Sequence, residues 1–191
     1  LADDAYEQMR YSGKTEYIAN VPGMYERTVT LYTFSKTYAM TGWRLGYCAG
    51  PKDVVRAINK LQSHMSSCPS SISQAAAAEA LTGDQSFVAA AAEQYRARRD
   101  LVVQRANAVD GLRALAGDGA FYVFIDCSGV IGRRTPAGVV IDSDDAFVGY
   151  LLEHAGVATI TGSAYGLSPF FRVSFATDEV TLLAAMDAIA D

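Results

Sequence analysis

Apolar and polar positions along this chain follow two different periods. Short runs of β-branched and aromatic residues predict strands, and longer segments with apolar residues three or four apart predict helices. The alternation of the two patterns predicts an α/β fold. The predicted strands are 27–34 (RTVTLYTF), 44–49, 119–129 (GAFYVFIDCSG), 157–161 (VATIT) and 170–176 (FFRVSFA). The predicted helices are 51–65, 73–81, about 84–109, 143–156 and 177–190.

Residues that favour helix ends mark most of these boundaries. A Ser, Thr or Asp side chain can accept hydrogen bonds from the first turn of a helix, and glycine is favoured just after the last turn. We therefore expect Asp84, Ser143 and Thr177 to cap helices, and Gly83 and Gly156 to end them.

The helix predicted from Asp84 is much longer than the others. Its apolar positions form one stripe, and its arginines lie off that stripe. Such a helix is suited to connect two subdomains. The stripe consists of Phe87, Ala91, Tyr95, Val102 and Ala106.

The composition argues against several classes of protein. The chain has 191 residues, a net charge of −5 and a pI of about 5.0. The densest basic group, Arg96, Arg98 and Arg99, fits the polar face of a helix better than a nucleic-acid site. No apolar run approaches the roughly 18 residues of a membrane span. Asp3 and Asp4 stand where a signal peptide would be basic.

The cysteines and histidines do not form a recognisable metal site. Cys48, Cys68 and Cys127 are widely spaced and odd in number, which favours free thiols in a reducing compartment and a cytoplasmic protein. His64 and His154 have no neighbouring ligand at metal-binding spacing, so we expect both on helix surfaces or ends and expect no bound metal.

The segment 31–47, LYTFSKTYAMTGWRLGY, carries the chemistry that stands out. A lysine at the end of a strand can form a Schiff base with a carbonyl cofactor. Hydroxyls at Thr33 and Ser35 and the guanidinium of Arg44 suit a phosphate group. Arg44 lies beyond a turn that we expect to need Gly42 and Gly46 for tight backbone. A lysine that reacts with an aldehyde beside a phosphate clamp indicates pyridoxal 5′-phosphate (PLP).

These residues are those of a known family. TFSKTYAMTGWRLG resembles the lysine signature of the PLP-dependent aminotransferases of fold type I, class I/II, although Thr33 stands where the family usually has Ser or Gly. LADDAYEQMRYSG is similar to the family's Asp-x-x-Tyr strand end, GDGAFYVFID to its Gly-Ala-Phe-Tyr strand and FFRVSFA to its Arg-x-Ser strand. LQSHMSSCPSSISQAA resembles a helix and loop at the family's dimer interface.

The resemblance implies a role for each matching residue. Lys36 would form the aldimine with PLP and then act as the base that moves the substrate Cα proton. Asp3 would pair with the pyridinium nitrogen, with Asp4 as the alternative, and Tyr6 would donate to the phenolic oxygen of the ring. Thr33, Ser35 and Arg44 would hold the phosphate. Arg172 would bind the substrate α-carboxylate; the other interpretation is a salt-bridged strand arginine.

The same resemblance implies that the chain is the later half of a protein about twice as long. It opens within an apparent strand and has too few strands for a closed parallel sheet. Residues 1–83 would be the C-terminal part of the large PLP-binding domain, which has a mixed, mostly parallel sheet. Residues 84–111 would be a long connecting helix, and 112–191 a small α+β domain. The family's glycine-rich phosphate loop, stacking aromatic and active-site asparagine would lie upstream.

The implied function is transfer of an amino group from an L-amino acid to a 2-oxo acid by a ping-pong cycle, in a homodimer. Two alternatives stay open: a PLP-dependent carbon–sulfur β-lyase, and a non-catalytic PLP-sensing domain of a transcription regulator. In the aspartate-specific branch a partner-subunit arginine binds the distal carboxylate, and Ser63 occupies that position here. This argues against that particular device without excluding aspartate as the substrate.

Overall fold

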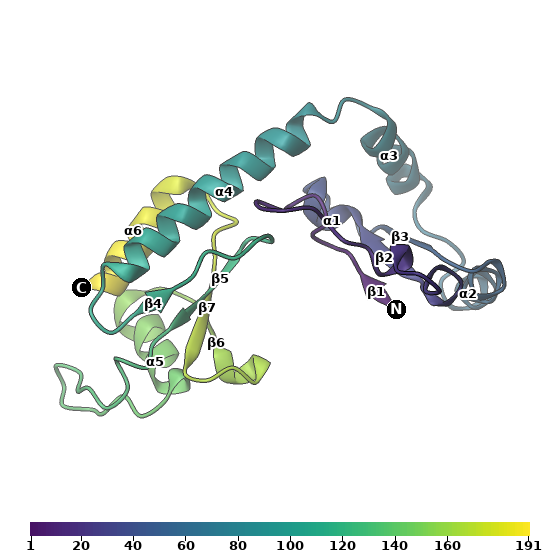
Figure 1. Ribbon diagram of the computed structural model, residues 1–191. Coiled ribbons are helices and arrows are strands. Elements are labelled where there is room, and N and C mark those ends of the chain that lie inside the picture. Colours follow the sequence, from purple (N-terminus) through teal and green to yellow (C-terminus); the bar gives the residue numbers. More distant parts are fainter. The chain divides into compact units, whose positions relative to one another are not determined.

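The computed structural model describes all 191 residues, which divide into two compact units, residues 1–92 and 93–191 (Figure 1). Each contains a small sheet and helices, so the predicted mixed α/β class is confirmed. None of the helices combines the length and apolar character needed to cross a lipid bilayer.

The sheet of the first unit has three strands in the order β1-β2-β3. β1 (Ala2–Asp3) runs parallel to β2 (Thr30–Thr33), and β2 runs antiparallel to β3 (Gly46–Ala49). This sheet is therefore mixed. A single helical turn, α1 (Phe34–Thr37), follows β2 directly and carries Lys36.

Three longer helices follow the first sheet: α2 (Lys52–Met65), α3 (Ser71–Thr82) and α4 (Ser86–Asn107), which ends in the second unit. Short 3-10 helices lie at Ile18–Asn20, Tyr25–Arg27 and Thr41–Trp43. The turn with Lys36 is anchored by a small core in which Phe34 and Met40 pack against Ala77 of α3.

The sheet of the second unit has four antiparallel strands in the order β4-β5-β7-β6. They are β4 (Arg113–Ala114), β5 (Tyr122–Asp126), β6 (Ile160–Thr161) and β7 (Phe170–Ser174). Burial alternates along β5 and β7, as expected for strands with one face in a core. Phe124 pairs with Arg172, and both lie on the face away from that core.

Helices cover the apolar face of this sheet. In Figure 1, α6 (Glu179–Ala190) runs beside the second half of α4, and Arg105 of α4 pairs with Asp187 of α6 at 3.0 Å. The first helix after β5, α5 (Asp144–Tyr150), continues into a π-helical turn, Leu151–Ala155. The core includes Val102, Ile125, Phe171, Phe175, Leu182 and Met186.

Several expected helix ends are confirmed. Ser143 Oγ accepts from Ala146 N at 3.2 Å, Gly156 ends the π-helical turn with a φ of 66°, and Gly83 follows α3. Asp84 Oδ1 accepts from Ser86 N, the first residue of α4. The prediction that Thr177 caps the last helix is wrong: Asp178 caps it.

The carboxylate of Asp178 takes both donors of Thr181, with Oδ1 accepting from the backbone N at 2.9 Å and Oδ2 from Oγ1 at 2.7 Å. One hydroxyl oxygen at Thr177 cannot match that pair of charge-assisted bonds. The apolar stripe of α2 also differs from a stripe packed within the chain, because Val54, Leu61 and Met65 are exposed and no α2 residue is buried.

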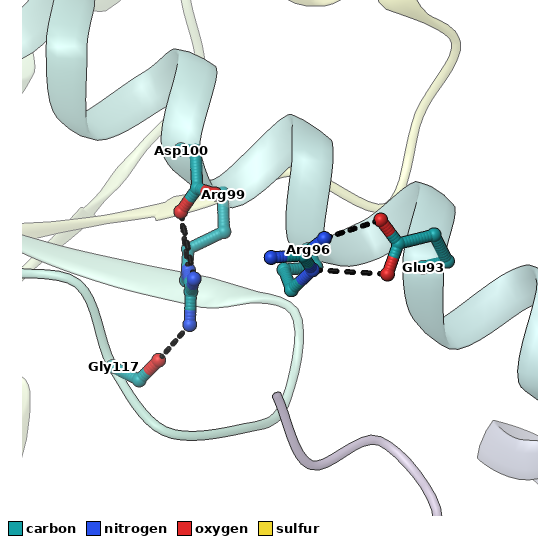
Figure 2. Close-up of polar contacts among 5 residues, drawn as sticks. All are labelled: Glu93, Arg96, Arg99, Asp100 and Gly117. Atoms are coloured by element: carbon teal, nitrogen blue, oxygen red, sulfur yellow. Dashed lines mark hydrogen bonds and ion pairs between the residues drawn. The ribbon is translucent and has the colours of Figure 1, made fainter. Parts of the chain in front are cut away.

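Figure 2 shows the polar contacts of Arg96 and Arg99, two of the three arginines grouped on α4. Arg96 forms a two-point ion pair with Glu93 three residues earlier and is half exposed, as expected for a polar helix face. Arg99 differs: its side chain is only 11% exposed, and it donates to the Gly117 carbonyl at 2.7 Å and to Asp100. Arg99 thus joins α4 to the loop before β5.

Candidate active site

Lys36 is positioned by the abrupt change from strand to helix at Thr33. Thr33 has extended backbone, and its Oγ1 accepts from Ser35 N at 3.2 Å, so it acts as the N-cap of α1. A capping hydroxyl uses only its oxygen lone pair in that bond, and its hydrogen remains available to another acceptor. The hydroxyl therefore shapes the lysine turn and can also donate to a phosphate.

The Lys36 ammonium lies near Tyr6, which belongs to the turn after β1. Lys36 Nζ is 5.7 Å from the centroid of the Tyr6 ring, a cation–π distance. The parallel pairing of β1 with β2 produces this approach, because both chains leave the sheet at the same edge. Two residues thirty positions apart, both expected in one site, are thus adjacent.

The two candidate carboxylates, Asp3 and Asp4, differ in their surroundings. Asp3 is in register with Leu31, so it lies on the sheet face that also carries Thr33. Asp4 donates its backbone N–H to the Leu31 carbonyl, and its Oδ2 is buried without a hydrogen-bond partner in the chain.

The charge of Asp4 acts on nearby tyrosines. Burial raises the pKa of Tyr32, and the charges of Glu7 and Asp4 raise it further. The pKa of Tyr17 is raised to about 12 by burial, by its hydrogen bond to Glu7 at 3.0 Å and by neighbouring negative charges that include Asp4. Asp4 therefore belongs to a group of carboxylates and tyrosines, and Asp3 lies on the Thr33 face.

Arg44 lies in a strained turn between α1 and β3. It has a left-handed backbone with a φ of 51°, which is uncommon for a residue with a side chain and is often found at functional sites. Ala39, earlier in the same loop, has the same φ. Arg44 Nη1 donates to the Thr41 carbonyl at 3.0 Å, and the side chain is exposed.

The two glycines of this turn have different roles. A Cβ on Gly46 would lie 2.5 Å from the Tyr32 carbonyl oxygen, so the pairing of β2 with β3 requires glycine there. The expectation that Gly42 is also needed is wrong, because a Cβ there would meet no atom within 4 Å and its φ is not left-handed. The left-handed backbone of this loop falls on two residues with side chains, Ala39 and Arg44.

Arg172 lies in the second unit, on β7, with Phe124 of β5 and Ile160 of β6 as its register partners. Its guanidinium carbon is 4.2 Å from the centroid of the Tyr122 ring and 4.7 Å from that of Tyr165. Arg172 takes part in no ion pair within the chain, so a salt-bridged strand arginine is not what the structure shows. A guanidinium can stack on aromatic rings while its N–H groups remain able to bind a carboxylate.

Sequence reasoning missed both tyrosines that hold Arg172. Tyr122 could have been found, because it lies two residues before Phe124 in a strand and so shares its face. Tyr165 has no such signal: it lies in a 3-10 helix, Gly162–Tyr165, between β6 and β7. Within the first unit the structure brings Lys36 near Tyr6 and places Thr33 and Ser35 in the lysine turn.

Comparison with known proteins gives the same family along the whole chain. A model of the family "Aminotransferase class I and II" matches residues 1–189. The aspartate aminotransferase of Rhizobium meliloti (strain 1021) is 49% identical over all of this chain and 47% of its own length. The aspartate/prephenate aminotransferase of Cereibacter sphaeroides is 47% identical over 94% of this chain and 46% of its own length.

Solved structures agree with the sequence relatives. The crystal structure of the Rhizobium meliloti aspartate aminotransferase matches with a TM-score of 0.94 at 50% identity, covering 98% of this chain and 47% of that one. The aromatic aminotransferase of Pyrococcus horikoshii matches with a TM-score of 0.84 at 37% identity over 98% and 49% of the two chains. The chain spans about half the length of these relatives. It belongs to the class I and II aminotransferase family.

Proposed function

We propose that the full-length protein is a PLP-dependent aminotransferase that moves an amino group from an L-amino acid to a 2-oxo acid by a ping-pong mechanism. The observation that carries the proposal is the approach of Lys36 to Tyr6, beside the hydroxyl-bearing turn of Thr33 and Ser35. The relatives are an aspartate aminotransferase and an aspartate/prephenate aminotransferase, which favours amino transfer over β-elimination or ligand sensing.

The donors of the first unit fit this cofactor. An amine, two hydroxyls and a guanidinium on one strand–turn–strand segment match an aldehyde and a phosphate, and Asp3 on the Thr33 face offers a carboxylate to a protonated ring nitrogen. When bound, PLP supplies an electron sink for negative charge at the substrate Cα. Thr33, Ser35 and Arg44 would hold its phosphate.

Three side chains of the first unit would act on the ring and the proton. Lys36 Nζ would anchor the cofactor and take the proton from the substrate Cα. The Asp3 carboxylate would keep the ring nitrogen protonated. The Tyr6 hydroxyl would donate a hydrogen bond to the phenolic oxygen of the ring.

Arg172 would bind the substrate α-carboxylate. A planar guanidinium forms two parallel hydrogen bonds with a carboxylate, and the rings of Tyr122 and Tyr165 support that plane. The lack of an ion pair to Arg172 within the chain suits a carboxylate ligand that arrives from solution.

The relatives favour aspartate among the substrates. The matching Thermus thermophilus aspartate aminotransferase, with a TM-score of 0.87 and 37% identity, was crystallised with maleate, a dicarboxylate. Ser63, at the position of the family's distal-carboxylate arginine, donates its hydroxyl to the Lys60 carbonyl of its own helix at 2.8 Å. A different residue of the full-length protein would then bind the distal carboxylate.

The same proposal covers assembly, location and domain division. We propose a cytoplasmic homodimer, because the three cysteines form no disulfide and α2 presents exposed Ile58, Leu61 and Met65 that the rest of a full-length dimer could cover. Residues 1–83 would be part of the large PLP-binding domain, and residues 112–191 would form the small domain. Residues 84–111 would be the helix that connects the two.

The test uses the full-length protein with PLP, L-aspartate and 2-oxoglutarate as one substrate pair among several. Borohydride reduction followed by peptide mapping should place the cofactor on Lys36, and Lys36→Ala should lose transfer while still binding PLP without a covalent bond. Asp3→Asn should lose far more activity than the matched neighbour Asp4→Asn. Labelling of another lysine would refute the site, and release of pyruvate and ammonia without amino transfer would indicate a lyase.

A further inference from the structure

One buried carboxylate outside the proposed site has three hydrogen-bond donors and no cationic partner. Asp144, the first residue of α5, is 1% exposed. Its Oδ2 accepts from Thr161 Oγ1 at 2.9 Å and from Ser163 N at 2.8 Å, and its Oδ1 accepts from Ser168 Oγ at 2.7 Å. Burial alone would raise its pKa, but these hydrogen bonds outweigh burial and lower the pKa.

All three donors come from one segment, residues 161–168, which begins at the last residue of β6 and leads toward β7. The Asp144 carboxylate therefore accepts hydrogen bonds from both ends of this loop and from Ser163 between them. The loop is also closed by its own backbone, since Leu167 N donates to the Gly162 carbonyl at 3.0 Å. A Cβ on Gly162 would lie 1.9 Å from the Leu167 oxygen, so the loop is folded too tightly there for any side chain.

The loop carries one ring to Arg172. Tyr165 lies between the Ser163 and Ser168 contacts, and its ring centroid is 4.7 Å from the guanidinium carbon. The ring also meets Phe124 edge-on at 5.4 Å, which fixes its tilt. Tyr165 is 49% exposed, so the sheet alone does not enclose it, and the loop decides where the ring stands.

We propose that Asp144 and Tyr165 are positioning residues for Arg172. The hydrogen bonds of Asp144 fix the 161–168 loop, and the loop places the Tyr165 ring beside the guanidinium. The orientation of the guanidinium is then set before a carboxylate binds. This inference rests on the proposed role of Arg172 in binding the α-carboxylate. Tyr122, on the rigid strand β5, supplies the other ring. The position of the Tyr122 ring is thus fixed by the sheet, and that of the Tyr165 ring by the loop that Asp144 holds.

The test measures whether these residues act through the α-carboxylate. In the full-length holoenzyme, kcat and KM are compared for the best L-amino acid and for the amine that has the same side chain but no α-carboxylate. For L-aspartate this amine is β-alanine, and its reaction is measured under single-turnover conditions. The variants are Tyr165→Leu, Asp144→Ala, Asp144→Asn and Ser168→Ala. Arg172→Lys is the reference, and Asp142→Ala, an exposed neighbour that does not contact the loop, is the matched control.

We expect Tyr165→Leu and Asp144→Ala to lower kcat/KM for the amino acid about 3- to 30-fold, mainly through KM, because a cation–π contact and the ordering of a side chain are of that size. The amine should be unaffected, and Asp142→Ala should match the wild type. In Asp144→Asn the amide oxygen can still accept from Thr161 and Ser163, and the amide NH₂ can donate a hydrogen bond to the Ser168 hydroxyl. This variant should therefore retain most of the kcat/KM that Asp144→Ala loses. Ser168→Ala should show a smaller decrease in kcat/KM for the amino acid. If Asp144→Ala does not fold, Ser168→Ala tests the role of Asp144 in its place.

Parallel losses for amino acid and amine would overturn the inference, because a merely structural role lowers both. So would unchanged amino-acid kinetics in Tyr165→Leu or in Ser168→Ala. If Arg172→Lys itself leaves the preference for the carboxylate unchanged, the proposed function of Arg172 fails instead, and this inference fails with it.

Discussion

Replacement of Arg172 by lysine keeps the charge and removes the geometry of the proposed carboxylate site. The guanidinium is planar, and its carbon lies over two tyrosine rings, 4.2 Å from the centroid of Tyr122 and 4.7 Å from that of Tyr165. An ammonium is a compact charge that cannot stack in this way, and it cannot offer two parallel donors to one carboxylate.

The expected loss follows from these two changes. A hydrogen bond to a charged group contributes about 1.5–3 kcal/mol, and a partly exposed cation–π contact about 0.5–1 kcal/mol. Lysine retains the charge and one hydrogen bond, so the loss of the second bond and of most of the stacking should total about 2–3 kcal/mol. This corresponds to a decrease in kcat/KM of about 30- to 150-fold.

The assay is steady-state transamination by the full-length protein with PLP at saturation, with cofactor binding followed by absorbance. Binding of PLP should be unchanged, because Arg172 lies outside the lysine segment. Arg105→Lys is the matched control: Arg105 forms a half-exposed ion pair with Asp187 at 3.0 Å, and such pairs contribute little. An Arg172→Lys enzyme with wild-type amino-acid kinetics would remove Arg172 from the site.

Three further predictions concern the chain itself. Cys127 is buried, and burial with the charges of Asp144 and Asp126 raises its pKa to about 12, so iodoacetamide at pH 8 should modify it only after unfolding, as mass spectrometry would show. The folded state lowers the pKa of Asp144, so its contribution to stability should be present above about pH 4, the usual carboxyl range, and lost as the pH falls through its pKa in the folded state. In chemical unfolding, the free energy of unfolding of Asp144→Asn should therefore fall less steeply at acid pH than that of the wild type. The same dependence on pH in both proteins would contradict this. The 191-residue chain alone should bind PLP weakly and transfer no amino groups, because the family resemblance assigns the phosphate loop, the stacking aromatic and further strands to the preceding half; turnover by a mass-verified 191-residue chain would show that the essential elements are misplaced.

Local sequence determined most elements and the family. Caps and stops act within one turn of their own helix, so Ser143, Gly83 and Gly156 could be identified without knowledge of the fold. The lysine segment is equally local, since Thr33, Ser35, Lys36 and Arg44 lie within one short stretch. The expectation that Thr177 caps the last helix was wrong, because the Asp178 carboxylate accepts from both the backbone N and the hydroxyl of Thr181.

Only the tertiary structure decided contacts that join distant segments. The pairing of β1 with β2 places Asp3 on the Thr33 face and brings Lys36 near Tyr6, and no periodicity in the sequence specifies that register. The helix 51–65 was predicted correctly, but only the structure shows that its apolar Val54, Leu61 and Met65 are exposed in this chain. Tyr165 and Asp144 could not have been found at all, because their relation to Arg172 depends on a loop closed by hydrogen bonds across about twenty residues, whereas sequence patterns report only neighbours along the chain.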